Sequence, residues 1–343
     1  MAVPTADQIL WMQEHIDETR VPGIHISNGI CLAASTISVI LRFISRRTGG
    51  FGLGKDDYCL FVGYLMYLLY VISFSFSTRY GQGRHVLLVT NIRAFAINNL
   101  LDMSFYVWGI SFIKYSILAQ YHRIFPSKQF HKVLYLVGAI VTSWALSAFF
   151  ASIFNCYPVR RSWDTTVPGH CIDYGKVTLI IGIFNIFIDF AMLAAPMPLL
   201  WKLQMSTRRK VFLSGAFVAG SMAFVVSIAR LFYAREVIVT WDSSWDNVMV
   251  GILSQLEMCT AIVAGCSITY RPLIERVFRI GSTSKVTGAS ASANSRQGWS
   301  KINVQHDIVM VSDARKPQPA KEPDEEQLRD WEMQTRGADG NWK

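Results

Sequence analysis

The sequence predicts an all-α fold: a bundle of seven transmembrane helices with the N-terminus outside the cell and the C-terminus in the cytoplasm. Three observations predict it. Of the 343 residues, 51% are apolar and only 17% are charged, a balance that is unusual for a water-soluble domain. Seven separate stretches are apolar and long enough to cross a bilayer. Lysine and arginine residues gather on one side of these stretches, as the positive-inside rule requires.

A transmembrane helix needs about 20 mostly apolar residues to cross a hydrocarbon core of about 30 Å. The first, second and fourth predicted spans carry no charge, and each of the other four holds one or two ionisable residues. A shorter apolar stretch, Val86–Ile97, contains Arg93 and suits an interfacial helix or an extension of the third span. The predicted spans are Val21–Leu41, Tyr58–Phe76, Leu100–Tyr121, Val133–Phe154, Val177–Trp201, Val211–Tyr233 and Val248–Tyr270.

The chain divides into three predicted regions. Residues 1–20 are polar and acidic and lack the basic and apolar segments of a cleavable signal peptide. We therefore expect a short extracellular N-terminus, with the first span directing insertion. Residues 21–280 form the membrane domain. Residues 281–343 mix Ser, Ala, Pro and Glu without sustained apolar periodicity, which predicts a disordered cytoplasmic tail.

Orientation follows from the basic residues. With the N-terminus outside, fourteen Lys and Arg residues fall on the cytoplasmic side and eight on the outer side. The tail holds nine basic and nine acidic residues, so the net charge of +9 belongs to residues 1–280. These basic residues lie among apolar spans, where they set orientation rather than bind nucleic acid. The bilayer is thus the expected partner, in the plasma membrane or an endomembrane.

Two of the six cysteines share one predicted outer loop. Cys156 and Cys171 bracket the connection between the fourth and fifth spans, on the side of the membrane where disulfides persist. We expect them to form a disulfide. The alternative is a pair of unrelated reduced thiols.

Ionisable residues inside spans are functional candidates because they are costly in lipid. At about 1.5 Å of rise per residue, Lys114 lies roughly 21 Å below the outer end of its span, Asp189 about 18 Å and Glu257 about 14 Å. A Lys114–Asp189 ion pair is therefore expected, with Gln255 and Asn185 as hydrogen-bonding neighbours. The cluster forms either a ligand or switch site, or a clamp that fixes helix register.

Further residues of the third and sixth spans need an interpretation. Tyr106 and Trp108 lie on the same span as Lys114 and are candidates to line an apolar ligand pocket, although aromatic residues on membrane helices also pack or face lipid. Arg230 and Asp102 lie near the outer ends of their spans, and we expect them at the interface.

No cofactor or metal site is expected. The seventh span contains no lysine that could anchor retinal as a Schiff base, and the seven histidines show no metal-ligand spacing within a span. Asp56 and Asp57 form an isolated acidic pair at a predicted cytoplasmic boundary, without the further aspartate that a magnesium–diphosphate site would need. The sequence shows no assembled catalytic site and leaves open whether the protein is an enzyme.

Several phrases at the predicted helix boundaries resemble the fungal rhodopsin-like integral membrane proteins. That family includes the membrane protein of a satratoxin biosynthesis cluster and overlaps pathogenicity-related fungal G-protein-coupled receptors. The resemblance covers about residues 20–280 and implies a seven-helix membrane protein with Lys114 and Asp189 in the family pattern. The phrases are Gly54-Lys55-Asp56-Asp57-Tyr58, Tyr80-Gly81-x-Gly83-x-His85, Lys114-x-Ser116-Ile117-Leu118, Tyr121-x-Arg123-Ile124-Phe125, Cys156-x-Pro158 with Trp163 and Cys171, Asp189 with Pro196 and Pro198, Leu200-Trp201-Lys202-Leu203-Gln204-Met205, and Arg271-Pro272-Leu273.

Two functions remain open at this stage. A receptor-like sensor of a small lipophilic ligand is favoured by seven spans, an outer N-terminus and a basic third cytoplasmic loop, Lys202–Lys210, that suits an acidic partner such as a G protein. The alternative is a membrane enzyme or accessory protein in fungal secondary metabolism. The resemblance favours this alternative, because pathogenicity-related members often carry a cysteine-rich outer domain and residues 1–20 contain no cysteine.

The predicted orientation can be tested with epitope tags at the two termini. In intact cells, antibodies should reach the N-terminal tag and should reach the C-terminal tag only after permeabilisation. A C-terminal tag that is accessible from outside would contradict the orientation.

Overall fold

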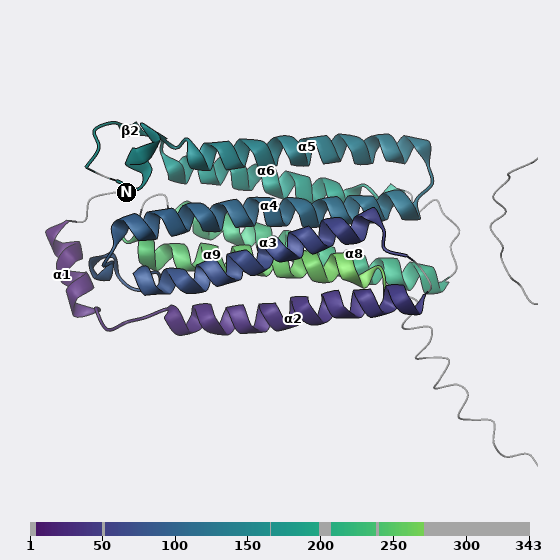
Figure 1. Cartoon of the computed structure of the whole chain (residues 1–343), viewed down its shortest axis with the longest axis horizontal. Coiled ribbons are helices and arrows are strands. Elements are labelled where there is room, and N and C mark those ends of the chain that lie inside the picture. The colour runs from purple at the N-terminus through teal and green to yellow at the C-terminus, as the bar shows by residue number, and fades with distance from the viewer. Residues whose placement is uncertain (1–4, 50–51, 165, 199–206, 238–239, 271–343) are drawn as a thin grey trace, which may run out of the picture. The chain divides into compact units, whose positions relative to one another are not determined.

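A computed structural model describes residues 5–49, 52–164, 166–198, 207–237 and 240–270. These residues form an all-α bundle of long, roughly parallel and antiparallel helices (Figure 1). A short helix, α1 (Ala6–Glu14), precedes the bundle. The predicted disordered tail lies outside the described residues. The long helices are α2 (Val21–Thr48), α3 (Lys55–Ser77), α4 (Ile92–Ile124), α5 (Lys128–Ile153), α6 (Tyr174–Ala194), α8 (Thr207–Val237) and α9 (Ser243–Ser267).

The ends of these helices follow local sequence signals. Pro22 lies in the first turn of α2, where its missing N–H breaks no helical hydrogen bond. Asn91 caps α4 because its side-chain oxygen accepts the N–H of Ala94 at 3.0 Å. The helix therefore starts well before the predicted third span. The second half of the apolar stretch Val86–Ile97 is an extension of α4, while Val86–Leu88 form a separate 3₁₀ turn.

Among the described residues, five of the long helices are apolar enough to cross a membrane by length and composition alone: α2, α3, α5, α6 and α9. Helix α4 is longer but less apolar, since it carries Asp102 and Lys114. In α8, Arg230 follows an uncharged stretch, residues 211–228. All three of these charged side chains are buried in the bundle. Because they are buried between helices, these charged residues can lie within long helices without being exposed to lipid.

The outside of the bundle is covered with large apolar side chains. On α2, Ile30 is 66% exposed, and Phe61 on α3 and Phe187 on α6 are each 65% exposed. Contact of such a surface with lipid is energetically favourable, whereas its contact with water is not. Inside, α4 packs against α3, α5 and α9 and forms the centre of the core with Tyr106 and Ile110.

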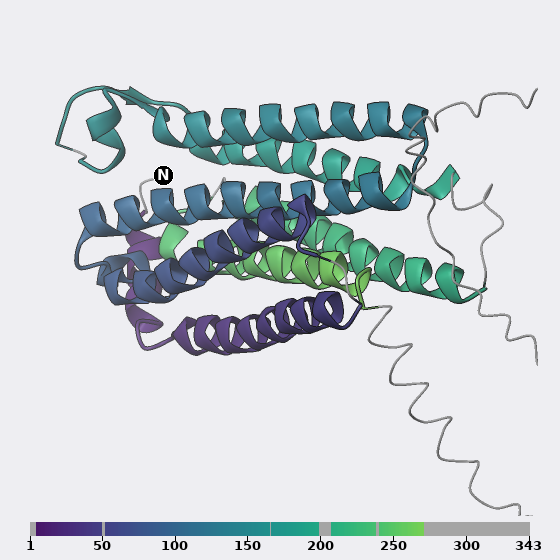
Figure 2. The ribbon, with the colours of Figure 1, turned by 45° about the vertical axis from the view of Figure 1, so that its right-hand side comes forward.

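The connection between α5 and α6 forms a small hairpin. Strands β1 (Cys156–Tyr157) and β2 (His170–Cys171) pair antiparallel, with Cys156 opposite Cys171. The two cysteines form the expected disulfide. The hairpin and α1 lie at the same end of the bundle in both views (Figures 1 and 2).

That end is closed by α1 and by the segment that follows α3. Gly81 and Gly83 have φ angles of 110° and 86°, which favour glycine and turn this segment back over the bundle. His85 is fully buried, its Nδ1 lies 2.6 Å from Asp242 Oδ2, and its ring stacks on Trp245. Trp11 of α1 packs edge-on against the His85 ring. The short helix is thus anchored to the bundle through aromatic contacts.

Loss of the disulfide should destabilise the hairpin between α5 and α6. The Cys156→Ser variant should lower the free energy of unfolding by about 3 kcal/mol, the loop-entropy value for a 15-residue separation. Thermal unfolding in detergent measures this change, with Cys59→Ser as the control because Cys59 is a half-buried free thiol. In protein prepared without reductant, both bridged cysteines should resist alkylation. Recovery of either as a free thiol would rule the bridge out.

Candidate functional site

Charged and polar side chains from four helices meet in the middle of the bundle. Helix α4 contributes Tyr106 and Lys114, α6 contributes Asn185 and Asp189, α8 contributes Ser227 and Arg230, and α9 contributes Glu257. These seven residues are called the central cluster below.

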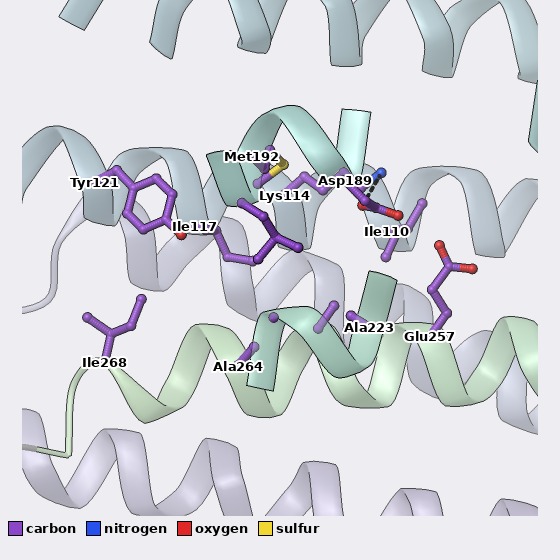
Figure 3. Close-up of a pocket in the computed structure, with 13 residues that line it drawn as sticks. Ile110, Lys114, Ile117, Tyr121, Asp189, Met192, Ala223, Glu257, Ala264 and Ile268 are labelled. Carbon is purple, nitrogen blue, oxygen red and sulfur yellow. Dashed lines mark ion pairs between the residues drawn. The ribbon is translucent and has the colours of Figure 1, made fainter. Parts of the chain in front are cut away.

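The first part of the central cluster is the ion pair between α4 and α6. Lys114 Nζ lies 3.0 Å from Asp189 Oδ1, as the dashed line in Figure 3 shows. The same ammonium donates a hydrogen bond of 2.5 Å to Asn185 Oδ1. Ser227 of α8 donates to Asp189 Oδ2 at 2.9 Å. The ion pair expected from the helix depths is therefore present and is held by hydrogen bonds from two further side chains.

A second ion pair joins α8 to α9. Arg230 Nε lies 3.2 Å from Glu257 Oε2, and Tyr106 donates its hydroxyl hydrogen to the same oxygen at 3.0 Å. The guanidinium of Arg230 also lies 4.8 Å from the centroid of the Tyr106 ring, a cation–π distance.

Asn185 connects the two ion pairs. Its amide nitrogen donates to Glu257 Oε1 at 2.7 Å while its oxygen accepts from Lys114. The two cations and two anions therefore form one charge-balanced network across α4, α6, α8 and α9. Lys114 is 2% exposed and Glu257 is 1% exposed, so removal of one partner would leave a buried charge uncompensated, at about 3–5 kcal/mol.

The other predicted site residues lie in different surroundings. Gln255 is fully buried, but neither of its amide atoms has a hydrogen-bond partner among the described residues. Trp108 packs against Phe112 of its own helix and Phe149 of α5, away from the central cluster. Of the two aromatic candidates on α4, only Tyr106 joins the cluster.

The expectation that Arg230 lies at the membrane interface is wrong. Its side chain is 9% exposed and is paired with Glu257. The sequence contained a signal for this pairing, because an unpaired Glu257 in the seventh span required a cation. From its position along α8 alone, Arg230 was expected near the interface, and for that reason its pairing with Glu257 was not predicted. Asp102 is also buried and accepts a hydrogen bond from Asn98 at 3.2 Å.

A cavity of about 50 Å³ adjoins the central cluster. Lys114, Asp189 and Glu257 form its charged wall, and the remainder is formed by Tyr121 and by small or apolar side chains. Figure 3 shows Glu257 at one end of this space and Tyr121 and Ile268 at the other. The remaining lining residues are Ile110, Ile117, Met192, Leu193, Gly220, Ala223, Ala261 and Ala264.

The acidic pair Asp56–Asp57 is not isolated, which corrects the sequence-based interpretation. Arg42 of α2 lies 2.6 Å from Asp56 Oδ2 and 2.7 Å from Asp57 Oδ1. Arg46 pairs with both carboxylates as well, and Arg42 also donates to the Gly265 carbonyl of α9 at 2.9 Å. This terminal cluster fastens α2, α3 and α9 together at the end of the bundle opposite α1.

Neither cluster has the composition of a metal site. Within the described ranges, no group of three or more His, Cys, Asp or Glu side chains could hold a metal ion. The chemistry that the central cluster offers is hydrogen bonding, charge pairing and proton exchange between buried groups.

The apolar outer surface and the charge-paired interior define an integral, multi-pass membrane protein. The chain belongs to the fungal rhodopsin domain family, which matches residues 41–276. No solved structure matches the chain.

The names of similar proteins include a biosynthesis cluster protein, a family membrane protein and a receptor. The chain is 27% identical over 169 residues to satratoxin biosynthesis SC1 cluster protein 4 of Stachybotrys chartarum, covering 49% of this chain and 61% of that protein. It is 30% identical over 184 residues to a SAT4 family membrane protein of Emericella nidulans, covering 51% and 48%. These matches span about half to three fifths of the two relatives. It is also 21% identical over 294 residues to the receptor GIN3 of Arthrobotrys oligospora, covering 81% and 70%.

The Lys114–Asp189 pair should be energetically coupled. Lys114→Met should destabilise the protein by about 3–5 kcal/mol because it leaves Asp189 buried without its cation. In an Asp189→Asn background the same substitution should cost about 0.5–3 kcal/mol less. Thermal or denaturant unfolding of the four proteins measures this coupling. Additive effects of the two substitutions would show that the pair is not coupled.

Proposed function

We propose that all seven long helices cross the membrane, with the N-terminus outside and the C-terminus in the cytoplasm. Pairing of Lys114 and Arg230 with carboxylates removes the main objection to α4 and α8 as spans. The disulfide hairpin supports the orientation, because it requires an oxidising compartment and lies at the same end as α1. Residues 1–20 then form the outer N-terminus, 21–280 the membrane domain and 281–343 a cytoplasmic tail.

We propose that the protein is a receptor-like sensor of a small lipophilic ligand that binds beside the central cluster. The observation that carries this proposal is the cavity whose charged wall belongs to a network joining four helices. A polar group that enters the cavity competes for hydrogen bonds that now hold α6 to α4 and α9. A ligand that binds one helix arrangement better than another shifts the population toward it.

The site of this ligand would include Lys114, Asp189, Asn185 and Glu257, with Tyr106 holding the far side of Glu257. Gln255 and Trp108 contribute to the helices around the site rather than to the lining. A cytoplasmic G protein is the proposed partner for the basic segment Lys202–Lys210. Residues 202–206 of that segment lie outside the described structure.

The second candidate is a membrane enzyme or accessory protein in secondary metabolism. The name of the Stachybotrys chartarum relative, a satratoxin biosynthesis cluster protein, favours it. In that case Lys114, Asp189 and Glu257 are the buried groups available for acid–base chemistry. The central cluster would then bind a substrate instead of a signal.

The two functions predict different behaviour of the purified protein. A sensor in lipid nanodiscs should show a higher unfolding temperature in the presence of a lipophilic extract of the source organism, because ligands stabilise the state that they bind. The loaded protein should accelerate nucleotide exchange on a Gα subunit from the same organism, and the extract should return chemically unchanged. Lys114→Met in the Asp189→Asn background should lose both responses, while Cys59→Ser keeps them.

Deletion of the gene followed by metabolite profiling provides the opposing result. If the deletion removes one product, and the purified protein restores that product from its precursor in vitro, the protein is an enzyme and the sensor proposal fails.

A further inference from the structure

The proposed ligand site has a feature that limits what it can bind. The four charges of the central cluster cancel: Lys114 and Arg230 are positive, and Asp189 and Glu257 are negative. The two ion pairs are linked through Asn185 into one buried unit. A ligand with a net charge would bring an uncompensated charge into a low-dielectric interior, where the penalty is several kcal/mol. The electrostatics of the cluster therefore favour a neutral ligand.

Lys114 offers that ligand a hydrogen-bond donor. An ammonium group has three N–H donors and no acceptor. Two of the three are directed at Asn185 Oδ1 and Asp189 Oδ1. Nζ also lies 5.3 Å from the centroid of the Trp144 ring, a cation–π contact, and among the described residues no third hydrogen-bond acceptor is found for it. Because Lys114 forms part of the cavity wall, the remaining donor suits a hydroxyl or carbonyl oxygen.

The size and shape of the cavity indicate how the rest of the ligand lies. About 10–15 Å³ is enough for one water molecule, so a cavity of about 50 Å³ takes a hydroxymethyl or carbonyl head with its first carbons. Beyond the head, the walls on α8 and α9 are made of Gly220, Ala223, Ala261 and Ala264. These small side chains leave a narrow apolar path for a chain.

The path leads away from the outer end of the bundle. The charged end of the cavity is buried, whereas Tyr121 and Ile268 at the other end are half-buried and lie where α4 and α9 finish. The outer end is covered: Met12 and His85 are fully buried, and the Gly83 N–H donates to the Ser244 carbonyl at 3.0 Å. Access from the α1 end would require these contacts to break.

We propose that the cavity binds an uncharged lipophile with one hydroxyl or carbonyl head at Lys114, and that this molecule enters from the end opposite α1. This inference rests on the proposed function and specifies its ligand. With the N-terminus outside, the ligand comes from the cytoplasmic half of the bilayer. The sensor would then respond to a compound made inside the cell.

The test uses the full chain in lipid nanodiscs and three photoreactive alkyl probes with the same diazirine-bearing chain. One probe ends in a hydroxyl, one in a carboxylate and one in an ammonium group. After illumination, peptide mass spectrometry locates the labelled residues. The alcohol should label cavity-lining residues of α4, α6 and α9 about tenfold more than either charged probe, which corresponds to about 1.4 kcal/mol.

Variants that fill the cavity provide the first control. Ala264→Leu on α9 should abolish this labelling, and Ala223→Leu on the opposite wall repeats the test should the first variant fail to fold. Val218→Leu on the exposed face of α8 lies outside the cavity and should be labelled like the wild type. Trp11→Ala loosens α1 at the outer end, and it should leave the rate of labelling unchanged if the ligand enters from the other end.

The outcomes separate this inference from the proposed function. Stronger labelling of the lining by a charged probe would overturn the neutral-head assignment and leave a lipophilic ligand site in place. Faster labelling of the Trp11→Ala variant would overturn the access route. If no probe labels the lining above the level of the Ala264→Leu variant, both the inference and the ligand site beneath it fail.

Discussion

The bundle depends on the mutual neutralisation of four charges that cannot reach water. Lys114, Asp189, Arg230 and Glu257 come from four different helices, and each is stable in the interior only while its partner stays within hydrogen-bonding distance. This requirement fixes the rotation of α4, α6, α8 and α9 about their axes more strictly than apolar packing does. Apolar side chains tolerate small rotations, whereas an ion pair in a low dielectric does not.

The same requirement bears on the proposed binding of a small molecule in the middle of the bundle. A packed apolar core changes little when one hydrogen bond is added. A network in which Asn185 serves two ion pairs at once is different, because a competitor for one of its bonds disturbs both pairs. The cavity lies directly beside this connection. Under the proposed function, the stability of the bundle and its response to a ligand therefore depend on the same atoms.

Most of the helical fold followed from the sequence, and the reasons are physical. All seven predicted spans lie within or mainly within long helices wherever the structure describes them, because apolar length is a local property. The Cys156–Cys171 bridge was predictable since both cysteines share one short loop. The Lys114–Asp189 pair was also predictable, because the rise of a helix fixes the depth of each residue.

Features that depend on helix rotation and tilt could not be predicted from the sequence. Depth along its span placed Arg230 near the interface, and the lack of a further aspartate nearby in the sequence made Asp56–Asp57 look isolated. Both are paired with residues on other helices. Trp108 could not be separated from Tyr106 by sequence, because the two residues differ only in the side of α4 from which they project. The closure of the bundle at the α1 end depends on contacts between α1 and segments distant in sequence, which no local sequence pattern indicates.

The terminal cluster has a consequence for which residues can be exchanged where α2 ends and α3 begins. Arg42 and Arg46 are buried and share the carboxylates of Asp56 and Asp57. Removal of either carboxylate would leave a buried guanidinium without part of its counter-charge. The basic residues near the end of α2 and the acidic residues at the start of α3 therefore depend on each other, and a change on one helix calls for a matching change on the other.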